Sequence, residues 1–79
     1  MITLDIVIVK WEDHHSTNGW QDISDISEEP LINTSVGFLV KETPNHIILA
    51  QSLVGDGEQC GDIISILKKT ITYKKEVIV

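Results

Sequence analysis

Four consecutive residues near the N-terminus have the side chains most able to do chemistry. Glu12-Asp13-His14-His15 joins two carboxylates to two imidazoles, which are ligands that zinc and other divalent cations accept. Neighbouring side chains of a strand point to opposite faces, so adjacent histidines reach one metal only from a loop. His14 and His15 are therefore candidate metal ligands. A solvated polar loop that binds no metal is the interpretation we favour.

A nucleophilic site would need a cysteine or serine beside a histidine and a third group that orients it. His46 and Cys60 are the candidates, and each stands alone in its sequence context. A lone cysteine is more often a small buried hydrophobic residue, so we expect Cys60 to be buried. Gly55-Asp56-Gly57 indicates a turn, because the helix and lysine of a phosphate-binding loop do not follow it. We expect no catalytic residues, no cofactor and no enzymatic activity.

The basic residues are concentrated at the C-terminal end. Four of the six lysines and arginines form the pairs Lys68-Lys69 and Lys74-Lys75, within the last twelve residues. Repeated around the axis of an oligomer, these lysines would form a basic patch able to contact RNA phosphates. Lysines also protect exposed strand edges from aggregation. Edge protection is the interpretation we favour.

The composition indicates one small acidic domain that spans residues 1–79. The chain has a net charge of -6 and one cysteine, so the net field opposes nucleic acids and an intrachain disulfide is excluded. Small domains gain stability from disulfides, metals or oligomerisation, and oligomerisation is the most available of these here. No apolar stretch approaches the roughly 18 residues of a membrane span. The run from Met1 to Val9 contains Asp5 and favours a strand over a signal peptide. We therefore expect a cytoplasmic protein without a membrane partner.

Alternating Ile- and Val-rich runs separated by turn residues predict five strands. The predicted strands are residues 4–11, 35–42, 46–54, 60–67 and 70–79. Short connections at 43–45, 55–58 and 68–69 favour a meander. Such a chain should curl into an all-β fold, a small five-stranded and strongly bent antiparallel barrel.

A long polar segment, residues 12–34, follows the first strand as a predicted loop. Trp20, Ile23 and Ile26 recur at a spacing of three, which favours a helical turn before Pro30. Loops of this length in compact domains are functional or pack against another element. We expect Trp11 and Trp20 to anchor the loop to the barrel.

About half of the chain resembles the Sm-like family. Gly37, Leu39, the turn at 43–45 and Ile47-Ile48-Leu49 follow the outline of the first Sm signature. Ile66-Leu67-Lys68 takes the place of the second signature, immediately before the last strand. The resemblance implies a strongly bent five-stranded barrel whose protomers join through their edge strands into closed rings.

The residues that contact RNA in the family are only partly matched. The turn is shorter than in the family, so Thr43 occupies the offset of the family's Asp and Asn45 aligns with its Asn across a gap. Leu67-Lys68 replaces the family's Arg-Gly pair. The candidate RNA-binding residues are therefore Asn45, which the resemblance implies, and Lys68 and Lys69, which their positive charge suggests.

We expect a non-enzymatic, ring-forming Sm-like module for interaction or assembly, with about five to seven subunits in the homo-oligomer as the resemblance implies. A single-stranded RNA-binding protein is one alternative. A small-ligand-binding or sequestering protein is the other. The chain also resembles short hypothetical proteins of tailed phages, through Trp11, Gly37-Phe38-Leu39-Val40 and Ile66-Leu67-Lys68-Lys69. This second resemblance implies a phage protein in the cytoplasm of the host cell.

Overall fold

The computed structural model describes residues 4–14, 19–27, 29–55 and 57–78. This part of the chain forms five strands and two short 3-10 helices, η1 and η2, and it contains no α-helix. The elements are β1 (Ile6–Asp13), η1 (Ile23–Asp25), β2 (Leu31–Glu42), β3 (His46–Val54), β4 (Gln59–Leu67), η2 (Lys68–Thr70) and β5 (Ile71–Val77). The prediction of an all-β fold with five strands is confirmed.

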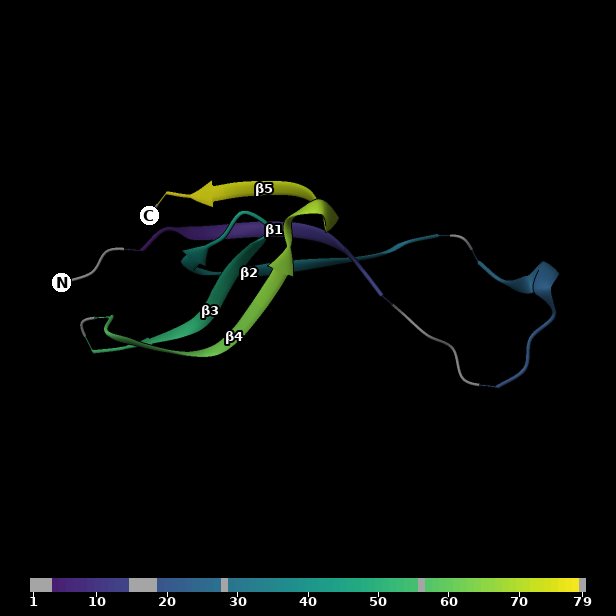
Figure 1. Cartoon of the computed structure of the whole chain (residues 1–79), viewed down its shortest axis with the longest axis horizontal. Coiled ribbons are helices and arrows are strands. Elements are labelled where there is room, and N and C mark those ends of the chain that lie inside the picture. The colour runs from purple at the N-terminus through teal and green to yellow at the C-terminus, as the bar shows by residue number, and fades with distance from the viewer. Residues whose placement is uncertain (1–3, 15–18, 28, 56, 79) are drawn as a thin grey trace.

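The five strands form one antiparallel sheet in the order β4-β3-β2-β1-β5. The register between β2 and β3 shifts between Leu39 and Lys41, and such a bulge bends a strand and increases its twist. Figure 1 shows the sheet as strongly curved, with β3 and β4 bending away from β1 and β5. In the described residues no ladder joins β4 to β5. The sheet is therefore open and does not close into the predicted barrel, and β4 and β5 are its edges. The predicted meander is wrong at its last step, because β5 pairs with β1.

The hydrophobic core lies on one face of the sheet. Its fully buried side chains are Val7, Val9, Ile47, Leu49 and Ile66. Trp11 packs against this cluster, and its indole Nε1 donates a hydrogen bond to Ser35 Oγ at 3.0 Å. Trp11 is thus a residue of β1 that packs on the core, and these contacts lie within the sheet and not in the loop. The core is small, as expected for a chain of this length. Its five fully buried side chains are all aliphatic.

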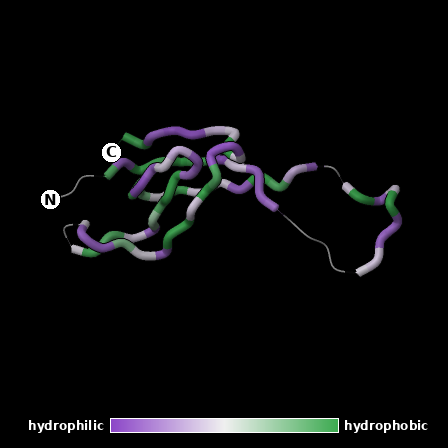
Figure 2. Tube along the Cα trace, in the orientation of Figure 1, coloured by the Kyte–Doolittle hydropathy of each residue, from purple (hydrophilic) through white to green (hydrophobic). Residues whose placement is uncertain are grey.

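A second apolar row crosses the opposite face of the sheet. Its members are joined in register, strand by strand: Ile63, Ala50, Phe38, Ile6 and Val77. Ile6 and Phe38 are half-buried, whereas Ile63 on the β4 edge exposes 58% of its surface. Figure 2 shows the hydrophobic segments concentrated in the strands, whereas the middle of β5 is hydrophilic. The sheet is thus apolar on both faces, although only one face holds the core.

The connection between β1 and β2, of which residues 14, 19–27 and 29–30 are described, projects away from the sheet as an arm (Figure 1). The molecule measures 56 Å along its longest axis and 24 and 22 Å across it. The predicted helical turn is present as η1. The predicted loop ends are wrong, because the two strands pair as far as Asp13 and Leu31. Asn33 Nδ2 donates to Asp13 Oδ2 at 2.6 Å, so side chains also join the strands at the base of the arm.

The expectation that Trp20 anchors the arm is wrong. Its side chain is fully exposed, with a relative exposure of 103%. Ile23 and Ile26 are also exposed, at 88% and 56%. The three apolar side chains of the arm are therefore exposed, and none belongs to the core cluster of the described residues.

Candidate functional site

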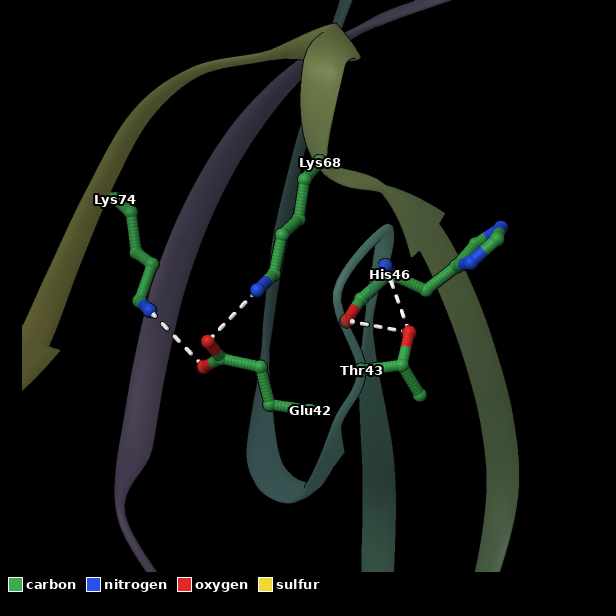
Figure 3. A network of polar contacts seen from close by, with 5 residues as sticks. All are labelled: Glu42, Thr43, His46, Lys68 and Lys74. Atoms are coloured by element: carbon green, nitrogen blue, oxygen red, sulfur yellow. Dashed lines mark hydrogen bonds and ion pairs between the residues drawn. The ribbon is translucent and has the colours of Figure 1, made fainter.

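The turn between β2 and β3 is held by a local hydrogen-bond network (Figure 3). The backbone N–H of Thr43 donates to the carbonyl of His46 at 2.9 Å. The N–H of His46 in return donates to Thr43 Oγ1 at 2.9 Å. Pro44 presets the backbone of the turn. The predicted turn at residues 43–45 is thus confirmed.

The connection between β4 and β5 packs against this turn. The N–H of Lys68 donates to the carbonyl of Asn45 at 2.7 Å, and Thr70 Oγ1 donates to the carbonyl of Leu67 at 2.7 Å. The structure therefore brings together the three candidate RNA-binding residues. Asn45 lies next to Lys68 and Lys69, although it is far from this pair in sequence.

These residues line one open cavity of about 430 Å³. Its walls are Pro44, Asn45, His46, Leu67, Lys68 and Lys69, and we call it the lysine cavity. Its volume falls in the range of about 300–1,000 Å³ that is common for ligand sites. It combines the apolar side chains of Pro44 and Leu67 with two lysines, of which Lys68 directs its ammonium group to Glu42. An anionic group attached to a flat apolar body fits this chemistry best.

Glu42 already binds one of the two lysines. Its Oε2 lies 2.8 Å from Lys68 Nζ and its Oε1 lies 3.8 Å from Lys74 Nζ (Figure 3). The hydrogen bond from Lys68, then the charges of Lys68 and Lys74, hold the pKa of Glu42 below its ordinary value of 4.5. Lys69 is exposed, and within the described ranges it takes part in no ion pair. Lys69 is thus the cation available to an incoming ligand.

Replacing Glu42 with glutamine should lower the melting temperature by a small amount at neutral pH. Because the folded-state pKa of Glu42 is lowered, its contribution is present above about pH 4.5 and is lost as the pH falls through the folded-state pKa. The melting temperatures of Glu42→Gln and the wild type should therefore converge as the pH falls below the folded-state pKa of Glu42. Thermal unfolding between pH 3 and pH 7 measures this. A difference that is unchanged at pH 3 would show that the effect comes from packing.

The candidate metal ligands are not brought into a metal site by the described residues. His14 is exposed after the end of β1, and its N–H donates to Asp13 Oδ1 at 2.7 Å. His15 lies outside the described residues. Within the described ranges no three His, Cys, Asp or Glu side chains converge to hold a metal ion. A pair formed by His14 and His15 stays a sequence prediction.

The candidate nucleophile and base lie at opposite ends of one hairpin. His46 pairs with Leu67, whereas Cys60 pairs with Leu53, seven residues along β3, which is roughly 20 Å in a strand. They cannot act on one substrate atom. The expected burial of Cys60 is wrong, because it is exposed at the start of β4, beside the β3–β4 turn. The turn predicted there is confirmed by a bond from the N–H of Gly57 to the carbonyl of Val54 at 3.0 Å, with Asp56 outside the described residues.

The sequence prediction missed the apolar walls of the lysine cavity and the role of Glu42. The walls come from two connections that meet only in the folded chain. Glu42 precedes the turn directly, and this position is the only signal in the sequence that it can reach η2.

Among the residues that the structure describes, no helix is long and apolar enough to cross a membrane. Comparisons of the chain with protein-family models, curated proteins and solved structures find no match.

Proposed function

We propose that this chain is a non-enzymatic self-assembly module whose copies join edge to edge into a closed, Sm-like ring. The observation that supports this proposal is the open five-stranded sheet, in which β4 and β5 are the two free edges. An edge strand presents unpaired N–H and C=O groups that proteins cover, protect or pair. Pairing β4 of one copy with β5 of the next satisfies both edges by one repeated contact.

Such a contact is heterologous, and it closes into a ring when the rotation between neighbours divides a full turn. The two edges are similar in length, since β4 has nine residues and β5 has seven. A nearly complete ladder is therefore available to each interface. The small core gives a further reason for assembly, because five fully buried side chains form the whole central cluster of the described chain.

The side chains on the two edges also favour association. Ile63 on β4 and Tyr73 on β5 expose 58% and 46% of their surfaces, and Ile78 after β5 exposes 93%. Ile63 is the outermost member of the apolar row that crosses the sheet. A neighbour paired along β4 would continue that row and remove Ile63 from water. Burial of apolar surface contributes about 25 cal/mol per Å².

Replacing Ile63 with lysine should prevent edge-to-edge assembly of the ring and leave the folded chain intact. A charge placed on an edge strand opposes pairing with another strand, and Ile63 lies outside the central core cluster. Ser52→Lys is the matched control, because Ser52 is exposed on β3 and pairs with Gly61 of the chain's own β4, so it does not lie on the β4 edge. Light scattering coupled to size exclusion measures mass, and far-UV circular dichroism measures folding. An Ile63→Lys protein that keeps the mass of the wild type would contradict pairing through β4.

Binding of single-stranded RNA is the second candidate function. The observation that favours it is the convergence of Asn45, Lys68 and Lys69 at the lysine cavity. The net charge of -6 and the ion pair of Lys68 with Glu42 oppose it. Retention of RNA on filters that falls as salt rises, and that Lys69→Glu abolishes, would support this function.

A further inference from the structure

The tip of the arm combines apolar exposure with negative charge. Trp20, Ile23 and Ile26 are all exposed, and they alternate with Asp22 and Asp25 along the chain. Figure 2 shows these hydrophobic and hydrophilic segments next to each other, far from the sheet. Three exposed apolar side chains on a projecting segment of an acidic protein call for a partner that covers them.

The tip also has a defined shape. The N–H groups of Asp25 and Ile26 donate to the carbonyls of Asp22 and Ile23, at 3.0 and 3.3 Å. This short helix curves the segment, so that Trp20, Gln21, Asp22 and Asp25 line a hollow. An aromatic face with two carboxylates beside it is a receptor for an ammonium group, through cation–π attraction and ion pairing.

The charges of the chain select the partner. No lysine or arginine occurs between Trp11 and Val40, whereas four of the six basic residues lie after Leu67. The lysine cavity provides the exposed ammonium of Lys69 beside the apolar walls of Pro44 and Leu67. The arm points away from its own sheet (Figure 1), so a second copy of the chain can offer this surface to it.

We infer that the arm tip of one copy docks on the lysine cavity of another copy. Lys69 enters the hollow formed by Trp20, Asp22 and Asp25, while the indole of Trp20 covers Pro44 and Leu67. This contact is separate from the proposed edge pairing and goes beyond it. It also explains how chains that each carry a charge of -6 associate, because the repulsion between whole copies is offset where opposite charges meet.

A charge exchange tests the contact. Asp22→Lys with Asp25→Lys, and separately Lys69→Glu, should each weaken self-association at least about tenfold in dissociation constant at low salt. The three substitutions combined in one chain should restore most of the lost affinity, because the charges are then exchanged and not removed. Lys41→Glu is the matched control, since Lys41 is an exposed lysine outside the lysine cavity. Sedimentation velocity over a range of concentrations gives the constants.

The outcomes separate this contact from edge pairing and from RNA binding. The charge exchange can also be made in the Ile63→Lys chain. If that chain still self-associates, and the charge substitutions weaken and then restore this association, arm docking is supported even if edge pairing is absent. Arm docking is overturned if the combined variant self-associates no more tightly than the Asp22→Lys/Asp25→Lys variant and the Lys69→Glu variant. It is also overturned if a chain with an Asn-Gly turn in place of residues 14–30 self-associates like the wild type. It is also overturned if Lys69→Glu abolishes filter retention of RNA but leaves self-association unchanged, since the lysine cavity is then a nucleic-acid site.

Discussion

Replacing Leu49 with alanine is expected to lower the free energy of unfolding by about 2–5 kcal/mol, the range for buried leucines. Leu49 is completely buried at the centre of the core cluster. It pairs with Leu39 on one side and with Ile64 on the other, so a cavity there has strands on both sides that limit its collapse. Domains of this size have only a few kcal/mol of stability in total. Much of the Leu49→Ala chain should therefore be unfolded at room temperature.

Urea unfolding followed by circular dichroism measures this effect. Leu31→Ala is the matched control, because it makes the same substitution at a residue that exposes 44% of its surface. Its expected effect is within about 0.5 kcal/mol, as for most surface positions. Equal losses in the two variants would contradict the core described here, because the cost would then not depend on burial.

The second large effect is expected at Gly37, where β2 approaches β3 most closely. A Cβ atom at this position would lie 2.8 Å from the carbonyl oxygen of Ala50 and 3.3 Å from Leu49 Cβ. The first contact is with backbone, which moves only if the β2–β3 ladder shifts. Gly37→Ala should therefore cost about 1–3 kcal/mol, as overpacked core positions do.

Gly61→Ala is the control for the Gly37 prediction. Gly61 also lies in a strand, but a Cβ there would meet nothing within 4 Å. Alanine restricts the unfolded chain more than glycine does, so Gly61→Ala should not lower stability. Denaturant midpoints of the two variants give the comparison. A Gly37→Ala protein as stable as Gly61→Ala would show that the strands can separate at this point without cost.

The strands were the most predictable part of the molecule. The predicted bounds of the third strand, residues 46–54, agree with β3, because proline and glycine turns mark both of its ends. The second strand begins at Leu31, four residues before its predicted start. Its added residues are polar or exposed, and they join the sheet only because β1 pairs with them. Such pairing is set by the partner strand and leaves little signal in the segment itself.

Burial was harder to predict, because it depends on which elements meet. Trp20 is a large apolar residue of the kind that is often buried, yet it lies on the arm, away from the sheet. Cys60 is a small residue that is usually buried, and it lies on a hairpin end that extends past the core. The candidate site was predicted in part. Asn45 was selected by resemblance and Lys68 and Lys69 by their charge, whereas the contact of Glu42 with Lys68 depends on the meeting of two distant connections.

The solution mass of the wild-type chain, measured by light scattering coupled to size exclusion over a range of concentrations, tests the central claim most directly. Edge pairing of β4 with β5 predicts a stable species of several times the 8.8 kDa chain, with a mass that stays constant on dilution once the ring is closed. A monomer of 8.8 kDa at every concentration would contradict both the ring and the docking of the arm.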